Sequence, residues 1–136
     1  MKKFFLIFLV SSSLFGGERF QISGDLIKDF RTDLMWQRES SSNTMNWKSA
    51  IQYCENLSLG GYRDWRLPHI DELKSIVNYN AYKPATFNRF KLKTTDWHWA
   101  ITKYNNSSSW IVNFNGGDDG WDRQADDSFA VCVRDL

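Results

Sequence analysis

The densest group of residues able to do chemistry is a run of carboxylates near the end of the chain. The five acids share one glycine-rich stretch: Asp118, Asp119, Asp122, Asp126 and Asp127. Hard cations such as Ca²⁺ take several oxygen ligands, which makes Asp118, Asp119 and Asp122 candidate calcium ligands. The carbonyls of Asn113 and Asn115 would assist. A solvated acidic loop explains the same residues, and the spacing matches no EF-hand, so calcium is one of two expectations.

A single tryptophan stands among these carboxylates. Trp121 lies in the polar stretch 115–128, which we expect to be a loop, and binding residues concentrate on loops held by a rigid scaffold. The flat face of an indole complements the apolar face of a sugar ring. Trp121, together with Asn113 and Asn115, is therefore the candidate ligand-binding group, while core packing accounts for most of the other tryptophans.

The sequence contains no recognisable catalytic constellation. Neither a Ser/His/Asp pattern, a phosphate loop nor a paired-acid motif is apparent, and neither His69 nor His98 has neighbours at zinc-ligand spacing. Arg63, Asp64 and Arg66 surround Trp65, and we interpret these charges as a structural ion network. No catalytic residue and no cofactor other than calcium is predicted.

The first residues predict the compartment. Two lysines, an apolar run from Phe4 to Val10 and then small residues are typical of a secretory signal. The run is too short to span a bilayer, which needs ~20 residues, and no later segment is apolar enough. We predict a signal peptide at residues 1–16 and one domain at residues 17–136, placed in the periplasm or outside the cell. An N-terminal core element is the alternative.

Charge and cysteine content fit an exported domain. Removing Lys2 and Lys3 leaves 15 basic against 16 acidic residues, so the formal charge moves from +1 to −1. A near-neutral domain has no field to gather nucleic acid. In an exported chain, Cys54 and Cys132 are expected to form a disulfide. Closing a loop of 78 positions is worth roughly 4–5 kcal/mol in the chain-entropy model. Two buried free thiols are the alternative.

The elements that position these residues follow from periodicity. Residues 20–28 suggest a first strand and residues 25–37 a hairpin. After Asn46, a helix cap, apolar residues recur at helical spacing: Trp47, Ala50, Ile51, Cys54 and Leu57. The pair Gly60-Gly61 is expected to close this helix.

A short extended segment separates this helix from a second one. It comprises Asp64, Trp65, Arg66, Leu67 and Pro68. Pro68 disfavours helical geometry at Leu67, and Glu72 stands three residues after His69, as a capping-box acid does. We expect Trp65 and Leu67 to be buried. Alternating segments follow from residue 97 to the end, so helices and antiparallel strands predict a single α+β domain with one disulfide.

These motifs, in this order, resemble the Lcl C-terminal domain family, which comprises bacterial exported domains with a C-type-lectin-like fold. The matching features are Gly24-Asp25, Leu34-Met35-Trp36-Gln37, Asn46-Trp47, Tyr53-Cys54, Asp64-Trp65-Arg66-Leu67-Pro68, Glu72-Leu73, Trp110 to Phe114 and Cys132-Val133-Arg134. The chain departs from the family pattern at Asp33, His69 and Val131. The namesake ends a surface adhesin that binds sulfated glycans, so the resemblance implies glycan or surface binding.

The leading hypothesis is therefore an exported, noncatalytic binding domain for a glycan or another envelope or extracellular partner. A small exported enzyme, or the accessory subunit of an envelope enzyme, is the alternative, and a purely structural envelope protein is a third. An exposed aromatic cleft next to the acidic loop would favour binding. A buried pair of titratable groups in a deep pocket would favour an enzyme.

Overall fold

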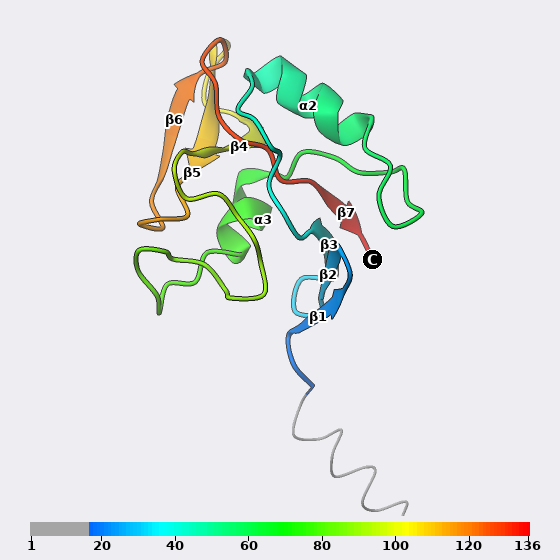
Figure 1. Ribbon diagram of the computed structural model, residues 1–136. Coiled ribbons are helices and arrows are strands. Elements are labelled where there is room, and N and C mark those ends of the chain that lie inside the picture. The colour runs from blue at the N-terminus through cyan, green and yellow to red at the C-terminus, as the bar shows by residue number, and fades with distance from the viewer. Residues whose placement is uncertain (1–16) are drawn as a thin grey trace, which may run out of the picture.

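The computed structural model describes residues 17–136 (Figure 1), so the predicted signal peptide at 1–16 lies outside it. The chain forms one α+β domain with two helices and two antiparallel sheets in its described part, as expected. The elements run in the order β1 (Phe20–Ser23), β2 (Leu26–Asp29), β3 (Leu34–Gln37), α2 (Trp47–Glu55), α3 (Ile70–Ser75), β4 (His98–Lys103), β5 (Ser108–Val112), β6 (Asp119–Arg123) and β7 (Val133–Asp135).

The first sheet has the order β1-β2-β3-β7 and contains the predicted hairpin as β2 and β3. The prediction of one continuous strand over residues 20–28 is wrong. A turn at Gly24-Asp25, with Gly24 at a φ of 61°, divides this segment into β1 and β2. The positive φ is open to glycine without a side-chain clash, so a single residue converts an expected strand into a hairpin.

The second sheet has the order β4-β5-β6. The turn expected at Asn115-Gly116-Gly117-Asp118 is present, with Gly117 at a φ of 83°. The expectation that residues 115–128 form a loop is wrong for Asp119–Arg123, which is β6. Two aspartates and a glycine give this segment low strand propensity, and pairing with β5 overrides it.

Helix α2 begins as predicted, because Asn46 Oδ1 accepts a hydrogen bond from the Ser49 backbone N–H at 2.9 Å. It ends earlier than predicted, at Glu55. Gly60 and Gly61, at φ 63° and 85°, form a two-residue turn in which Leu59 and Tyr62 exchange backbone hydrogen bonds of 3.1 and 3.0 Å. Positive φ at both positions is what such a hairpin turn requires.

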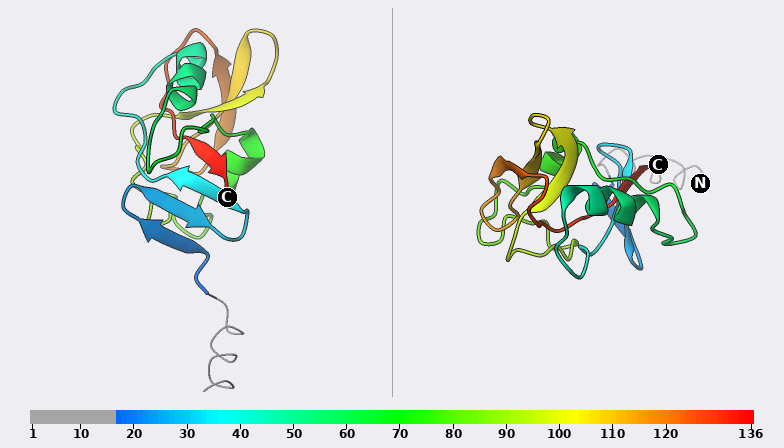
Figure 2. Two further views of the ribbon diagram at one scale, coloured as in Figure 1. Left: turned by 90° about the vertical axis from the view of Figure 1, so that its right-hand side faces the viewer. Right: turned by 90° about the horizontal axis from the view of Figure 1, so that it is seen from above.

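Two clusters of apolar side chains fill the domain, one around Trp36, Leu73 and Phe114 and the other around Trp65, Trp99 and the cysteines. Figure 2 shows the two sheets at opposite ends of the domain, with β7 alongside β3 and facing the other sheet. The predicted disulfide joins Cys54 in α2 to Cys132, just before β7. In the described residues, no helix is long and apolar enough to cross a bilayer.

Candidate functional site

The hinge, residues 64–68, is held as an extended segment by the chain's last strand. Arg66 and Val133 exchange two backbone hydrogen bonds of 2.9 Å each. Side chains alternate on extended backbone, so Trp65 and Leu67 point into the core, where they are 2% and 1% exposed, while Arg66 points out. The burial expected for the two apolar residues is confirmed.

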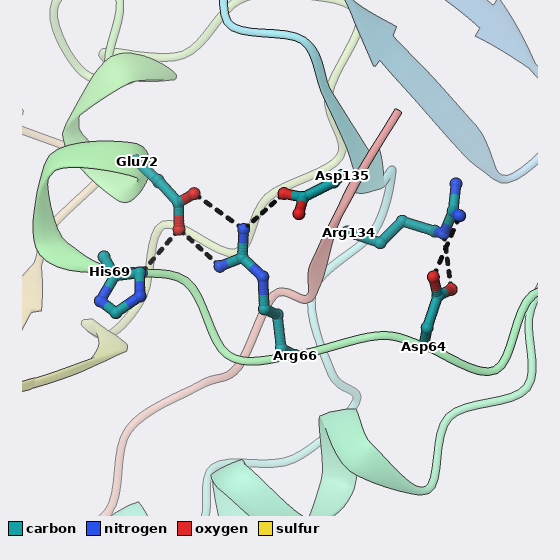
Figure 3. Close-up of polar contacts among 6 residues, drawn as sticks. All are labelled: Asp64, Arg66, His69, Glu72, Arg134 and Asp135. Atoms are coloured by element: carbon teal, nitrogen blue, oxygen red, sulfur yellow. Dashed lines mark hydrogen bonds and ion pairs between the residues drawn. The ribbon is translucent and has the colours of Figure 1, made fainter.

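Arg66 ties the hinge to α3 and to β7 (Figure 3). Its Nη1 and Nη2 donate to Glu72 Oε1 and Oε2 at 2.7 and 2.9 Å, and Nη2 also donates to Asp135 Oδ1 at 2.9 Å. Glu72 Oε1 also accepts from the His69 backbone N–H at 2.9 Å. Burial alone would raise the pKa of Glu72, but these hydrogen bonds hold it below its ordinary value.

A second ion pair fixes the start of the hinge. Arg134 donates to both carboxylate oxygens of Asp64 at 2.6 and 3.1 Å (Figure 3), which lowers the pKa of Asp64. The Arg134 guanidinium also lies 3.9 Å from the centroid of the Tyr62 ring. Asp64 and Arg66 are therefore paired, as the structural ion network predicted around Trp65 requires. Arg63, the third residue of that prediction, is exposed and makes no ion pair within residues 17–136.

The aromatic surface, which comprises Tyr104, Trp110 and Trp121, lies on the second sheet. Trp110 and Trp121 are register partners on β5 and β6, and Tyr104 directly follows β4. The Tyr104 and Trp121 rings stack at 4.7 Å with an interplanar angle of 10°, and Trp110 meets Tyr104 edge-on at 5.5 Å. Trp121 is 51% and Tyr104 47% exposed. Three strands therefore position an exposed aromatic group, of which sequence reasoning identified only Trp121 as a leading candidate.

The other predicted binding residues lie in the adjoining turn. Asn113 Oδ1 accepts backbone hydrogen bonds from Asn115 and Gly116 at 2.7 and 3.2 Å. The Asn115 backbone carbonyl accepts hydrogen bonds from the backbone N–H groups of Lys83 at 2.9 Å and Ala85 at 3.1 Å. These oxygens hold the turn against the long segment that precedes β4, and so they position Asp118 and β6.

The candidate calcium ligands are distributed over the turn and the strand. Asp119 pairs with Lys74 of α3 at 3.3 Å, while Asp122 Oδ1 accepts the Arg123 backbone N–H at 2.8 Å. Asp118 and Asp119 are exposed. Within residues 17–136, no three His, Cys, Asp or Glu side chains are gathered so that they could hold a metal ion.

One serine–histidine contact was missed by sequence reasoning. Ser40 Oγ lies 2.7 Å from His98 Nε2 and also accepts the Lys93 backbone N–H at 2.9 Å. His98 is fully buried against Phe114 and Phe129, and this burial lowers its pKa to about 3. The neutral His98 ring is therefore held in the core by this hydrogen bond, and no part of it is exposed to solvent.

A groove of about 510 Å³ beside α3 was also missed, because its residues come from separate segments of the chain. It is lined by Arg19, Arg31, Thr32, Lys74, Ser75, Val77, Asn78, Tyr79, Asn80 and Phe87. Arg19 is bound to the buried Asp29 at 2.9 and 2.8 Å and to the Ser75 carbonyl at 2.8 Å. Arg19, one of the three cationic residues that line the groove, is thus engaged in holding β1 and β2 to α3.

Comparison with known proteins adds one match. The model of the Lcl C-terminal domain family matches residues 25–134. No curated protein matches the chain. The matched range includes the disulfide, the hinge and the whole aromatic surface.

Proposed function

We propose, on the premise that the chain belongs to the Lcl C-terminal domain family, that it is an exported, noncatalytic domain that binds carbohydrate on its aromatic surface. The observation that carries this proposal is the stacked pair of Tyr104 and Trp121, about half exposed on a rigid sheet. Each of these parallel rings covers one face of the other, and the ring faces that the stack leaves uncovered are flat and apolar, which is what stacking against a sugar ring requires.

The surroundings of the aromatic surface favour a ligand rich in hydroxyl groups. Side chains two residues apart on a strand share a face, so Asp119 lies on the same face of β6 as Trp121. Asp119 is paired with Lys74 at 3.3 Å, so this ion pair offers both acceptors and donors to sugar hydroxyls. A neutral sugar rich in hydroxyl groups therefore fits this surface.

Export and fold are part of the same proposal. A buried disulfide is typical of proteins from oxidising compartments, and residues 1–16 have the composition of a secretory signal. Both observations support periplasmic or extracellular placement. The family's C-type-lectin-like architecture is supported by two helices, two antiparallel sheets and a long irregular segment between α3 and β4.

A glycan array probed with the oxidised domain 17–136 tests this function. Trp121→Ala and Tyr104→Ala should lose the array signal, while Tyr79→Ala, which removes another exposed aromatic away from the sheet, should keep it. Equal binding by wild type and Trp121→Ala would move the site elsewhere. Absence of any glycan signal from the folded wild type would overturn the carbohydrate proposal in favour of an envelope protein partner.

A further inference from the structure

Strand β6 forms an open edge of the second sheet. It is the last strand in the order β4-β5-β6, and Figure 1 shows it as the outermost strand of that sheet. At the opposite edge, β4 is covered by other segments of the chain. The backbone N–H of Trp99 donates to the Phe129 carbonyl at 2.9 Å, and that of Ile101 donates to the Pro68 carbonyl at 2.7 Å. The sheet thus has one edge closed by its own chain and one edge facing outward.

The register of β5 and β6 identifies which backbone groups point outward. The Asn113 N–H donates to the Asp118 carbonyl and the Gln124 N–H to the Ser107 carbonyl, both at 2.8 Å. Hydrogen-bonded and non-hydrogen-bonded pairs alternate along an antiparallel ladder. Gly120 and Asp122 therefore face β5, whereas the N–H and C=O groups of Asp119 and Trp121 face away from it.

Arg123 also faces away from β5, but its outward backbone groups are already hydrogen-bonded within the chain. The Arg123 N–H donates to Asp122 Oδ1 at 2.8 Å, and the Arg123 carbonyl accepts from Asp126 at 2.9 Å. Within the described residues 17–136, the outward N–H and C=O groups of Asp119 and Trp121 make no hydrogen bond. Four backbone groups on two alternate residues are what one added strand needs in order to pair.

Some of the aspartates on this edge are ion-paired and others are not. Asp119 is paired with Lys74 and Asp126 with Arg123, but no ion pair engages Asp118 or Asp122 within the described chain. Positions 118 and 122 share one face of the extended segment, opposite to Trp121. On a strand added to β6, every second side chain would therefore lie on the same face as the unpaired carboxylates of Asp118 and Asp122.

We propose that the β6 edge accepts an extended basic segment of a partner protein as an additional strand. Backbone hydrogen bonds to Asp119 and Trp121 would hold the segment, as in strand addition to other open sheet edges. Lysine or arginine side chains at alternate positions would contact Asp118 and Asp122. A second copy of this chain fits less well, because a register centred on Gly120 would place Asp118 opposite Asp122, and a register centred on Trp121 would leave both of these acids without a cation.

This proposal is separate from carbohydrate binding. The sugar would stack on the ring faces of Tyr104 and Trp121, whereas the peptide would pair with the backbone of β6 in the plane of the sheet. A change confined to backbone donors at the edge should affect the peptide and leave the sugar unaffected. The two proposals can therefore fail independently.

The probe is a short capped peptide of alternating lysine and threonine, titrated calorimetrically into the oxidised domain at low ionic strength. Binding should be lost when alternate peptide residues are N-methylated, because this removes the donors needed for pairing, and when glutamate replaces lysine. In the protein, Asp119→Pro should bind at least about fivefold more weakly than the matched Asp119→Asn, because only proline removes the outward N–H. Asp118→Asn combined with Asp122→Asn should weaken binding about tenfold at low salt.

Unchanged affinity of the N-methylated peptide, or equal affinity of the lysine and glutamate peptides, would overturn the proposal. So would failure of the lysine peptide to bind the folded wild type. A dimer in sedimentation that Asp119→Pro dissociates would assign the edge to a second copy instead. An unchanged far-ultraviolet circular-dichroism spectrum and a cooperative thermal melt of Asp119→Pro show that the variant is folded and that the effect belongs to the edge alone.

Discussion

The hinge and β6 are both short extended segments that carry a tryptophan and several charges, yet their environments are opposite. Trp65 in the hinge is 2% exposed and Trp121 in β6 is 51% exposed. The hinge backbone is paired with Val133 and its arginine is bound by two acids. One side of β6 is paired and the other is open.

This contrast indicates that pairing, and not residue type, separates the structural hinge from the surface that we propose for recognition. In the hinge, every charge and its tryptophan are engaged by the chain itself, so substitution there should cost stability. In β6, the chain leaves aromatic faces, carboxylates and backbone groups exposed, so substitution there should cost binding. The predictions below test this division.

The largest expected effect is loss of the disulfide that anchors α2 beside the hinge. Replacing Cys54 and Cys132 with alanine should lower the free energy of unfolding by about 4–5 kcal/mol, because it frees a loop of 78 positions in the unfolded chain. Chemical denaturation of the oxidised wild type and the double variant measures this. A difference near zero would mean that the bond does not restrain the fold.

Trp65→Ala should destabilise the domain by about 4 kcal/mol, since truncating a buried aromatic removes apolar contacts and leaves a cavity. The matched change on the other region is Trp121→Ala, which should cost about 1 kcal/mol or less, because its ring is half exposed and loses mainly its stack on Tyr104. Thermal melts of both variants compare the two regions directly. Similar losses of stability would break the division.

The acid sensitivity of the hinge follows from Glu72. Its folded-state pKa lies below the unfolded value, so its stabilisation is complete above the unfolded pKa and is lost as the pH falls through the folded pKa. Glu72→Gln should be less stable than wild type by about 1–2 kcal/mol at neutral pH, a figure reduced for partial exposure. This gap should narrow on acidification. A gap that stays constant with pH would show that the carboxylate charge contributes nothing.

The smallest effect concerns calcium. Because the described residues gather no three acidic side chains, calcium should leave the melting temperature of the oxidised domain unchanged. A ligand that binds the native state would raise it by mass action. A rise that disappears when Asp118, Asp119 and Asp122 are all replaced by asparagine would instead identify β6 as a metal site.

Much of the hinge region could be predicted from sequence because its signals are local. Pro68 restricts Leu67, alternation sets Trp65 and Leu67 inward, and export predicts the disulfide. The exception is Gly60-Gly61, because a glycine pair is equally suited to closing a helix and to forming a two-residue turn. Only the pairing of Leu59 with Tyr62 distinguishes the two.

The β6 region was predicted less well, since its structure depends on distant partners. Apart from Trp121, no residue of Asp119–Arg123 favours a strand, and pairing with β5 makes the segment one. Tyr104 gave no signal, because its stacking on Trp121 joins residues from two strands. Burial of His98 against Phe114 and Phe129 likewise depends on contacts between residues that are distant in the sequence. The same holds for the groove beside α3, whose walls come from separate segments.

The most direct test of the division is an NMR titration that follows the indole N–H signals of the seven tryptophans in the oxidised domain. On addition of a glycan selected by the array, the Trp121 signal, followed by that of Trp110, should shift while the signals of the buried Trp65 and Trp36 stay in place. A shift at Trp65 with none at Trp121 would contradict the account, because it would place recognition at the hinge and leave the exposed sheet without a role.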